Sequence, residues 1–351
     1  MVFHPRLHSG GNVVGVSPLD SNKSYRVWVI GLAVGLLALT APPADAGSKA
    51  RGSVAAPSAS KASPVKRSRA IRVRKIVPAR PSMGQLIGLH ASDDPLDLKS
   101  GVALVLDEDT NEVLLAKNTQ TVLPIASITK LMTALVVTEA GLPLDEVLTV
   151  DAQDVDTEKG SGSRLRVGTA LTRAEMLHLA LMASENRAAH ALGRHYPGGL
   201  PAFVEAMNHK AQALGMKDTH YVEPTGLSSR NQSNAADLAL LVREAHKHDL
   251  IRRLSTMPEA AVAVGRRSLQ FRNTNGLVRN SDWDISLQKT GYISEAGRCL
   301  VMQAQLAGRK LILVLLDSAG KYSRIGDAER IRKWLTETAA THATAVVAPQ
   351  G

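Results

Sequence analysis

Residues 124–135 read PIASITKLMTAL, and the fold prediction starts from this stretch. Its apolar side chains recur at helical spacing; they are Ile128, Leu131, Met132, Leu135 and, just beyond the stretch, Val136. The opposite side of this helix carries Thr133 and Ala134 rather than charged residues, so we expect the helix to be buried on most sides. Lys130 lies three residues after Ser127, and this spacing puts both side chains on one face of the helix.

Ser127 and Lys130 together have the chemistry of an activated nucleophile. A serine hydroxyl is a poor nucleophile until a neighbouring base removes its proton. A lysine can act as this base when burial and a second cation lower its pKa, and Lys289 is a candidate for that cation. The N-terminus of the helix also provides backbone N–H groups beside Ser127, where a negatively charged oxygen could develop. We therefore interpret Ser127 as a candidate nucleophile and Lys130 as its proton acceptor.

Two further short motifs follow, Ser184-Glu185-Asn186 and Lys289-Thr290-Gly291. Ser184 follows an apolar helical segment and could relay a proton. Asn186 can both donate to and accept from a peptide amide. Gly291 has no side chain, so a substrate backbone could lie against the strand that contains it. The two motifs therefore supply the proton relay and the substrate contacts that a serine nucleophile needs.

Each motif has an ordinary explanation when it is taken alone. Ser127 would then be a helix cap, Lys130 a solvated residue and Ser184 part of a loop. Other serine and lysine pairs with the same spacing begin in a linker or in strands, at Ser58, Ser63, Ser286 and Ser318. The pair at Ser127 differs because it opens a buried helix, and three motifs in this order favour the catalytic interpretation.

The segments around these motifs predict an α+β fold. Apolar runs at 100–106 and 112–116, separated by a polar turn, are typical of a strand hairpin. Later strands are expected at 285–292, 298–306 and 310–316, before a final amphipathic helix at about 327–336. Helical segments lie between the two sets of strands. This order predicts an antiparallel sheet flanked by helices, with a helical insertion.

Start and stop signals delimit the helices of the insertion. Thr172 and Glu175 form a capping-box pattern ahead of an apolar segment. Pro201 suits the first position of a helix that Gly215 ends. Ser233 can cap the helix that follows.

The three motifs in this order resemble the serine penicillin-recognising enzymes, which comprise the penicillin-binding proteins and the serine β-lactamases. Within this group the chain is most similar to the low-molecular-mass D-alanyl-D-alanine peptidases of family S11, of the penicillin-binding protein 7 endopeptidase type. The resemblance covers about residues 95–338 and implies a β-lactamase/transpeptidase-like fold. The stretches that carry it are residues 124–135, 162–168, 187–189, 195–199, 222–229 and 271–275.

This resemblance implies catalytic roles at the matching positions. Ser127 would form the acyl-enzyme, Lys130 would accept its proton, and Ser184 would protonate the leaving amine. The backbone N–H groups of Ser127 and Tyr292 would form the oxyanion hole. The implied reaction is hydrolysis of D-alanyl cross-links between peptidoglycan stem peptides, with β-lactams as covalent inhibitors and without a cofactor.

The resemblance also implies how the substrate is held. Asn186 would bind the acyl side chain, Lys289 and Thr290 would bind the substrate carboxylate, and Gly291 would let its backbone approach. Glu185 occupies a position that is small or acidic in many relatives, and its side chain is expected to point away from the pocket.

Three other functions stay open at this stage. A β-lactamase would need a glutamate that activates water, and Glu223 is a candidate, although the residues after Pro224 do not continue the class A loop. A D-alanyl-D-alanine carboxypeptidase would usually carry a further C-terminal domain and a membrane helix, whereas a polar, alanine-rich tail follows the last predicted helix here. A catalytically silent peptidoglycan-binding protein is disfavoured by the intact motifs.

The N-terminal part is typical of an export signal. Lys23 and Arg26 precede an apolar run at 27–41, and Ala44 and Ala46 form a small-residue cleavage site. We expect a signal peptide at 1–46, a disordered basic linker at 47–90, the peptidase domain at 91–340 and a flexible tail at 341–351. The mature protein would then be periplasmic, without a stable membrane span; an uncleaved membrane anchor is the alternative, but the run is short for a spanning helix.

The net charge of +10 comes from one segment of the chain. Ten basic residues and no acidic residue lie at 47–80, whereas residues 81–351 carry 29 basic and 30 acidic residues. A basic, alanine- and proline-rich segment without aromatic residues is typical of a linker. The near-neutral remainder argues against nucleic acid as a partner.

Metal ligation is not expected. One cysteine, Cys299, excludes an intrachain disulfide, and its apolar neighbours indicate a buried free thiol. The histidines at 178, 190 and 195 share a helix face only in part, so they are interpreted as satisfied or solvated. Asp154, Asp156 and Glu158 resemble the start of a calcium loop, but Lys159 occupies the position that needs glycine, so we expect a solvated acidic loop.

Overall fold

The computed structural model describes residues 80–347, with side chains described as far as residue 339. A five-stranded antiparallel sheet has the strand order β2-β1-β11-β10-β9. Its strands are β1 (Ser100–Asp107), β2 (Val113–Lys117), β9 (Asp284–Ile293), β10 (Gly297–Leu306) and β11 (Arg309–Ser318). The predicted antiparallel sheet is confirmed, and the bounds of its strands lie close to the predicted ones.

The helical insertion lies between β2 and β9 in the chain. Its helices are α2 (Thr129–Glu139), α3 (Arg173–Met182), α4 (Asn186–Arg194), α5 (Gly199–Ala213), α6 (Ala235–His246) and α7 (Asp249–Thr256). Three short pairs of strands connect them: β3 (Leu123–Pro124) with β6 (Gln232–Ser233), β4 (Val147–Thr149) with β5 (Ala170–Thr172), and β7 (Glu259–Val264) with β8 (Arg267–Arg272).

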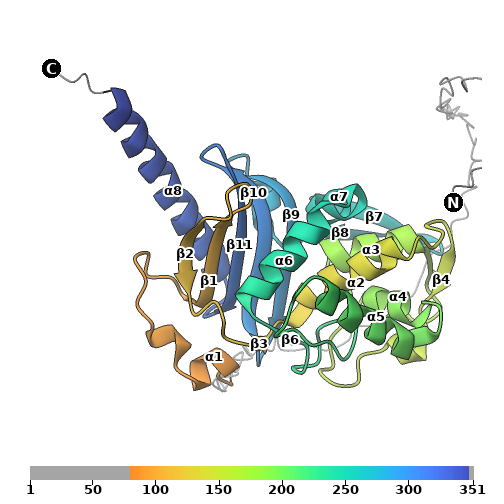
Figure 1. Cartoon of the computed structure of the whole chain (residues 1–351). Helices are drawn as coiled ribbons and strands as arrows, with labels where there is room; N and C mark the ends of the chain where they lie inside the picture. Colours follow the sequence, from red (N-terminus) through yellow and green to blue (C-terminus); the bar gives the residue numbers. More distant parts are fainter. Residues whose placement is uncertain (1–79, 348–351) are drawn as a thin grey trace, which may run out of the picture. The chain divides into compact units, whose positions relative to one another are not determined.

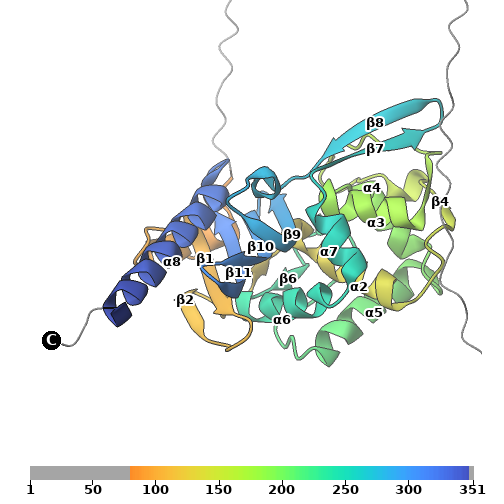
Figure 2. The ribbon, with the colours of Figure 1, turned by 90° about the horizontal axis from the view of Figure 1, so that it is seen from above.

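The sheet is covered on both faces, by α8 (Ser323–Val347) on one and by the helical insertion on the other (Figures 1 and 2). Successive residues of a strand point to opposite faces, and β11 uses this alternation in full. Leu311, Leu313 and Leu315 belong to the apolar core that contains Ile331 of α8. Ile312, Val314 and Leu316 belong to the core shared with the insertion, which includes Leu238 and Leu241 of α6.

Helix α2 runs through the middle of the insertion, and its residues from Thr129 to Val137 are all buried. The buried hydroxyl of Thr133 donates to the carbonyl oxygen of Pro224 at 2.7 Å, so a polar group in the core has a partner. The prediction of a helix buried on most sides is confirmed.

The predicted C-terminal boundary of the linker, residue 90, was wrong, because the folded part already includes residues before it. Helix α1 (Met83–Leu86) and the turn η1 (Leu89–Ala91) are folded, and Ser82 and Gln85 form a capping box. The side chain of Asn118 donates to the carbonyl oxygen of Leu89 at 3.1 Å, which ties this segment to the sheet domain. The contact of Asn118 with Leu89 is tertiary and could not be predicted from composition, whereas the capping box of Ser82 and Gln85 is local and its pattern was missed. The predicted signal peptide and the linker up to residue 79 lie outside the described residues.

Two predicted helix starts were wrong. Asn234, not Ser233, caps α6, because its side chain accepts from the backbone N–H of Asp237 at 2.8 Å. Ser233 instead belongs to β6. Helix α5 begins at Gly199, so Pro201 is its third residue rather than its first.

The final helix is longer than predicted. Helix α8 runs from Ser323 to Val347, beyond the predicted helix at 327–336 and into the predicted tail at 341–351. The alanine-rich composition of the tail favours helix and explains the extension; residues 348–351 lie outside the described part. Within residues 80–347, no helix combines the length and the hydropathy that crossing a bilayer requires.

The hairpin of β7 and β8 was not predicted. It lies at the margin of the helical insertion, near α3 (Figures 1 and 2). Val262 and Phe271 are its buried residues, and most of the others are exposed. Such a ribbon gives little of the apolar alternation from which strands are recognised.

Candidate active site

Ser127 lies in the turn η2 (Ala126–Ile128), immediately before α2 and against strand β9. Strand β9 forms one edge of the five-stranded sheet. Two glycines allow the turn to pack so closely. A Cβ on Gly291 would lie 3.0 Å from the backbone nitrogen of Ser127, and a Cβ on Gly226 would lie 1.8 Å from the carbonyl oxygen of Ala126. Ser127 is thus held between the sheet edge and the loop that contains Gly226.

Lys130 is fully buried beside Ser127. Its Nζ lies 2.9 Å from Ser127 Oγ, 2.7 Å from Asn186 Oδ1 and 2.6 Å from the carbonyl oxygen of Thr225. Burial lowers the pKa of Lys130 to about 7, although the charges of Glu223 and Glu185 act in the opposite direction.

These three contacts define what a neutral Lys130 could do. A neutral amine has two N–H bonds and one lone pair. Asn186 Oδ1 and the Thr225 carbonyl accept hydrogen bonds and cannot donate them at these atoms. With both N–H bonds used there, the lone pair is left for Ser127 Oγ at 2.9 Å. The arrangement therefore suits transfer of a proton from Ser127 to Lys130.

Ser184 and Lys289 form a second pair. Lys289 Nζ lies 2.9 Å from Ser184 Oγ and 2.8 Å from the carbonyl oxygen of Thr290. Burial, followed by the charges of Lys130 and Arg324, lowers the pKa of Lys289 well below its ordinary value. Ser184 has a φ of 60°, a left-handed conformation that is costly for a serine. A strained residue held by a buried lysine is typical of a functional position.

Asn186 is the first residue of α4 and uses both ends of its side-chain amide. Oδ1 accepts from Lys130, and Nδ2 donates to Ser161 Oγ at 2.8 Å. Asn186 therefore connects the first two motifs directly.

The third motif lies on β9. Thr290 Oγ1 is 2.6 Å from Thr274 Oγ1, whose own hydroxyl is near the carbonyl oxygen of Met182 at 3.4 Å. Tyr292 is half-exposed, and the guanidinium of Arg298 lies 4.5 Å from the centre of its ring. The structure thus brings all the residues of the three predicted motifs to one place, around the N-terminus of α2 and the edge strand.

Four residues of this site were missed by sequence reasoning: Ser161, Thr225, Thr274 and Arg324. Arg324 is largely buried, and its Nη1 donates to the carbonyl oxygen of Gly291 at 3.2 Å. Desolvation lowers the pKa of this arginine. It reaches the site from the start of α8, and no motif in the sequence around it gave a signal.

Glu223 has a structural role in this site. Its carboxylate accepts from the backbone N–H groups of Thr225 and Gly226, both at 2.6 Å, and from the side-chain amide of Asn231 at 3.1 Å. The carboxylate thereby fixes the loop that presents the Thr225 carbonyl to Lys130. A carboxylate engaged in this way is a poor candidate for the water-activating base of a β-lactamase.

Glu185 also has partners in the protein. Its carboxylate accepts from Ser163 Oγ at 2.6 Å and lies 4.0 Å from Nε of Arg164. Both partners belong to the loop that also provides Ser161. Glu185 therefore helps to attach this loop to the start of α4.

The histidines considered for metal binding have separate neighbours. His190 Nδ1 lies 2.7 Å from Asp154 Oδ1, and His195 Nδ1 lies 2.9 Å from the carbonyl oxygen of Ala191. Burial lowers the pKa of His178. The structure therefore does not bring these three side chains to a common site.

The acidic residues at 154–158 do not form a common site either. Asp154 pairs with Arg194 at 2.9 Å. The Asp156 carboxylate accepts from the backbone N–H groups of Glu158, Lys159 and Ser161. This pattern is that of a loop held by one aspartate.

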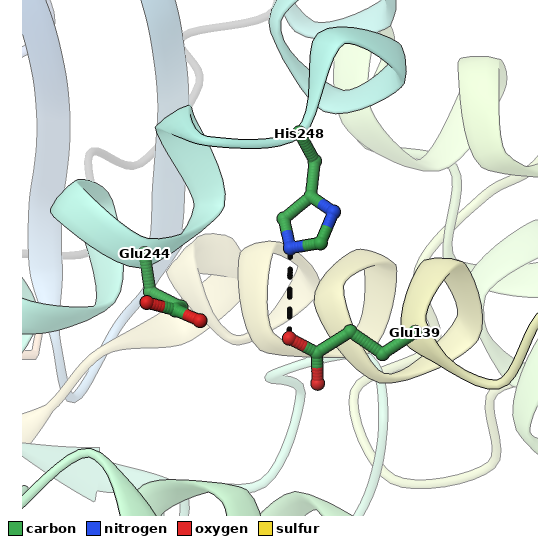
Figure 3. A group of neighbouring side chains, drawn as sticks. All are labelled: Glu139, Glu244 and His248. Carbon is green, nitrogen blue, oxygen red and sulfur yellow. Dashed lines mark ion pairs between the residues drawn. The ribbon is translucent and has the colours of Figure 1, made fainter.

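Glu139, Glu244 and His248 form another cluster of potential metal ligands (Figure 3). His248 Nε2 lies 3.5 Å from a carboxylate oxygen of Glu139. The ammonium of Lys210 lies 2.6 Å from Glu139 and 3.2 Å from Glu244, so this cluster already contains a cation of the protein.

Cys299 is a buried free thiol in β10, as predicted. Burial raises its pKa to about 12. The thiol is thus a packing residue rather than a nucleophile.

Comparison with known proteins places this site in a family. Residues 89–320 match the peptidase S11 family model, described as D-alanyl-D-alanine carboxypeptidase. The chain is 52% identical over 241 residues to a D-alanyl-D-alanine endopeptidase of Pseudomonas aeruginosa, covering 68% of this chain and 78% of that protein. It is 48% identical over 241 residues to the D-alanyl-D-alanine endopeptidase of Escherichia coli, with the same coverage of 68% and 78%.

Solved structures agree with this relationship. The Streptomyces K15 DD-transpeptidase superimposes with a TM-score of 0.63 at 27% identity, covering 68% of this chain and 97% of that one. Penicillin-binding protein D2 of Listeria monocytogenes, in its ampicillin-bound form, gives a TM-score of 0.58 at 28% identity, with coverage of 68% and 97%. The predicted β-lactamase/transpeptidase-like fold is confirmed, and the chain belongs to peptidase family S11, the D-alanyl-D-alanine carboxypeptidase family.

Proposed function

We propose that this protein is a serine D-alanyl-D-alanine endopeptidase that hydrolyses D-Ala cross-links between peptidoglycan stem peptides. The contact of buried Lys130 with Ser127, at 2.9 Å, carries the proposal because it provides a nucleophile together with its base. The names of the relatives from Pseudomonas aeruginosa and Escherichia coli support the endopeptidase activity.

The proposed reaction begins with neutral Lys130. Lys130 takes the proton of Ser127 Oγ while that oxygen attacks the D-alanyl carbonyl carbon. The resulting oxyanion would accept hydrogen bonds from the backbone N–H groups of Ser127 and Tyr292. Ser184, in contact with Lys289, would give its proton to the leaving amine and be reprotonated through Lys289. Water would then attack the acyl ester and give a proton to Lys289 through Ser184. Lys130 would return its proton to Ser127 Oγ as the bond to the acyl group breaks, which restores the enzyme.

Substrate binding would use Lys289, Arg324 and the edge of the sheet formed by β9. Lys289, Thr290 and Arg324 lie at this edge and form the proposed carboxylate site, and Gly291 leaves room for the substrate backbone. Asn186 would bind the acyl side chain once its contacts with the protein rearrange. β-Lactams would acylate the same serine and leave slowly.

We propose a periplasmic location, reached through the signal peptide predicted at 1–46. Residues 47–79 would serve as the basic linker, and peptidoglycan stem peptides would be the partner of the folded domain. These assignments rest on the pattern of Lys23, Arg26 and the apolar run at 27–41.

The test compares two purified substrates, a cross-linked muropeptide dimer and a monomeric pentapeptide. We expect the mature protein to cleave the dimer. Cleavage of the pentapeptide alone would make the protein a D-alanyl-D-alanine carboxypeptidase, the second candidate, which the two cations Lys289 and Arg324 beside the strand edge also suit. Rapid turnover of penicillin would point to a β-lactamase.

A further inference from the structure

A groove lined by arginines lies beside the proposed active site. One wall is the loop with Ser163, Arg164 and Arg166, and the other is the β7–β8 hairpin with Val264, Arg267 and Leu269. The cavity has a volume of about 490 Å³, within the range of sites that hold small ligands or short peptide segments. The hairpin that forms its outer wall is visible at the margin of the domain (Figure 2).

The loop wall is fixed to the start of α4, which also carries the second catalytic motif. Ser161 Oγ accepts from Asn186, Ser163 Oγ donates to Glu185, and the Leu165 carbonyl oxygen accepts from Arg187 Nη1 at 2.7 Å. Ser161, Ser163 and Leu165 thus contact the start of α4. Arg164 and Arg166 are their neighbours in the loop and line the groove. The loop wall of the groove is therefore attached directly to the segment that carries Ser184 and Asn186.

The hairpin wall is attached to the loop through Arg164. Its guanidinium lies 3.8 Å from the centre of the Phe271 ring and donates to the carbonyl oxygen of Gln270. Arg164 thus connects the two walls.

The groove has an excess of positive charge. None of its lining residues is acidic, and within residues 80–339 neither Arg166 nor Arg267 has a carboxylate partner. Glu185 is buried against Ser163 and lies 4.0 Å from Nε of Arg164, so it offsets the charge of that arginine only. Exposed guanidinium groups without a counter-ion are well suited to bind carboxylates in a bidentate manner.

We propose that this groove binds the free carboxylates of a stem peptide in cross-linked peptidoglycan. The inference rests on the proposed function, because it requires that a stem peptide bound at Ser127 extends along the attached loop into the groove. Stem peptides are acidic chains with free carboxylates, which Arg166 and Arg267 match in charge. Val264 and Leu269 provide apolar surface for the methylene groups between those carboxylates. A small β-lactam would occupy the site around Ser127 without reaching the groove.

The experiment measures binding of a cross-linked muropeptide dimer to full-length mature protein in a Ser127→Ala background, which prevents turnover. Adding Arg166→Ala and Arg267→Ala together should raise the dissociation constant about tenfold. Arg266→Ala is the matched control, because Arg266 lies in the same hairpin turn and does not line the groove. A dimer whose stem carboxylates are converted to amides should bind both forms equally weakly. Equal binding of the unmodified dimer by parent and double variant would overturn the inference.

Two further readouts separate this inference from the proposed function. With Ser127 intact, the double variant should react with fluorescent penicillin at the parent rate, while its KM for the dimer rises about tenfold. Raising the salt concentration should weaken dimer binding by the parent more than by the double variant. If the parent binds the dimer through these arginines but does not cleave it, the proposed function fails and the groove assignment stands. If the parent cleaves the dimer and the double variant does so with unchanged KM, the groove assignment fails alone.

Discussion

Acylation of Ser127 by a fluorescent penicillin should depend on pH through the ionisation of Lys130. The pKa of this buried lysine is lowered to about 7. Protonated Lys130 has no lone pair, so the acylation rate should fall as pH drops through this value and reach a plateau above it. About half of the molecules would carry neutral Lys130 at pH 7 and about 1% at pH 5, so the rate at pH 5 should be roughly 100-fold below the plateau.

The assay is stopped-flow or quenched labelling of the mature protein between about pH 5 and pH 9, where the fold is checked by circular dichroism. Lys130→Arg keeps the positive charge but supplies no base at these pH values, so its acylation rate should lie about 10²- to 10⁴-fold below the parent's plateau and should not show the transition near pH 7. Lys310→Arg changes an exposed lysine of β11 and should leave the profile as it is.

Two results would refute this reasoning. One is an acylation rate that does not change between these pH limits, or whose midpoint lies near the ordinary pKa of lysine. The other is a Lys130→Arg variant that reacts at the parent rate and remains folded.

Three further changes test other parts of the account. Gly291→Ala places a methyl group 3.0 Å from the backbone nitrogen of Ser127, so penicillin acylation should fall about 100-fold in a folded protein; an unchanged rate contradicts this. Glu223→Gln removes loop hydrogen bonds worth about 2 kcal/mol and should lower the melting temperature by about 4–8 °C, while the lifetime of the penicilloyl adduct stays constant; a much longer lifetime would restore the water-activating role. Ile331→Ala, in the α8 core, should reduce the free energy of unfolding by about 2–4 kcal/mol in urea titrations; exposed Lys333→Ala is its control, and equal stability of the two would show that α8 adds nothing to the core.

Strands β10 and β11 of the main sheet could be predicted because most of their residues are buried and apolar and their ends are marked by polar turns. In β11, for example, seven consecutive residues from Leu311 to Asp317 are buried. The β7–β8 hairpin lacked this signal, since few of its residues are buried, and its partner in space is a loop nearly a hundred residues earlier. The predicted N-cap of α6 was wrong for a different reason. Ser233 and Asn234 are both good N-cap residues, and the end of β6 at Ser233 makes Asn234 the cap.

The reactive residues of the site could be named from short motifs, because Ser127 and Lys130 share a helix face. The contacts that surround Lys130 and the charge that acts on Lys289 could not be predicted from these motifs. The Thr225 carbonyl is a backbone atom and leaves no trace in residue type, and Arg324 approaches from the far end of the chain. The sequence also left Glu223 open as a catalytic base, and the hydrogen bonds of its carboxylate to the Thr225 and Gly226 N–H groups are what argue for a structural role.

The central claim is that Ser127 forms the covalent intermediate. The most direct measurement is intact-mass analysis of the mature protein after reaction with penicillin, followed by peptide mapping of the adduct. The account predicts one penicilloyl group, on the peptide that contains Ser127, and no adduct on a folded Ser127→Ala variant. Equal labelling of the parent and Ser127→Ala, or an adduct mapped to Ser184, would contradict it.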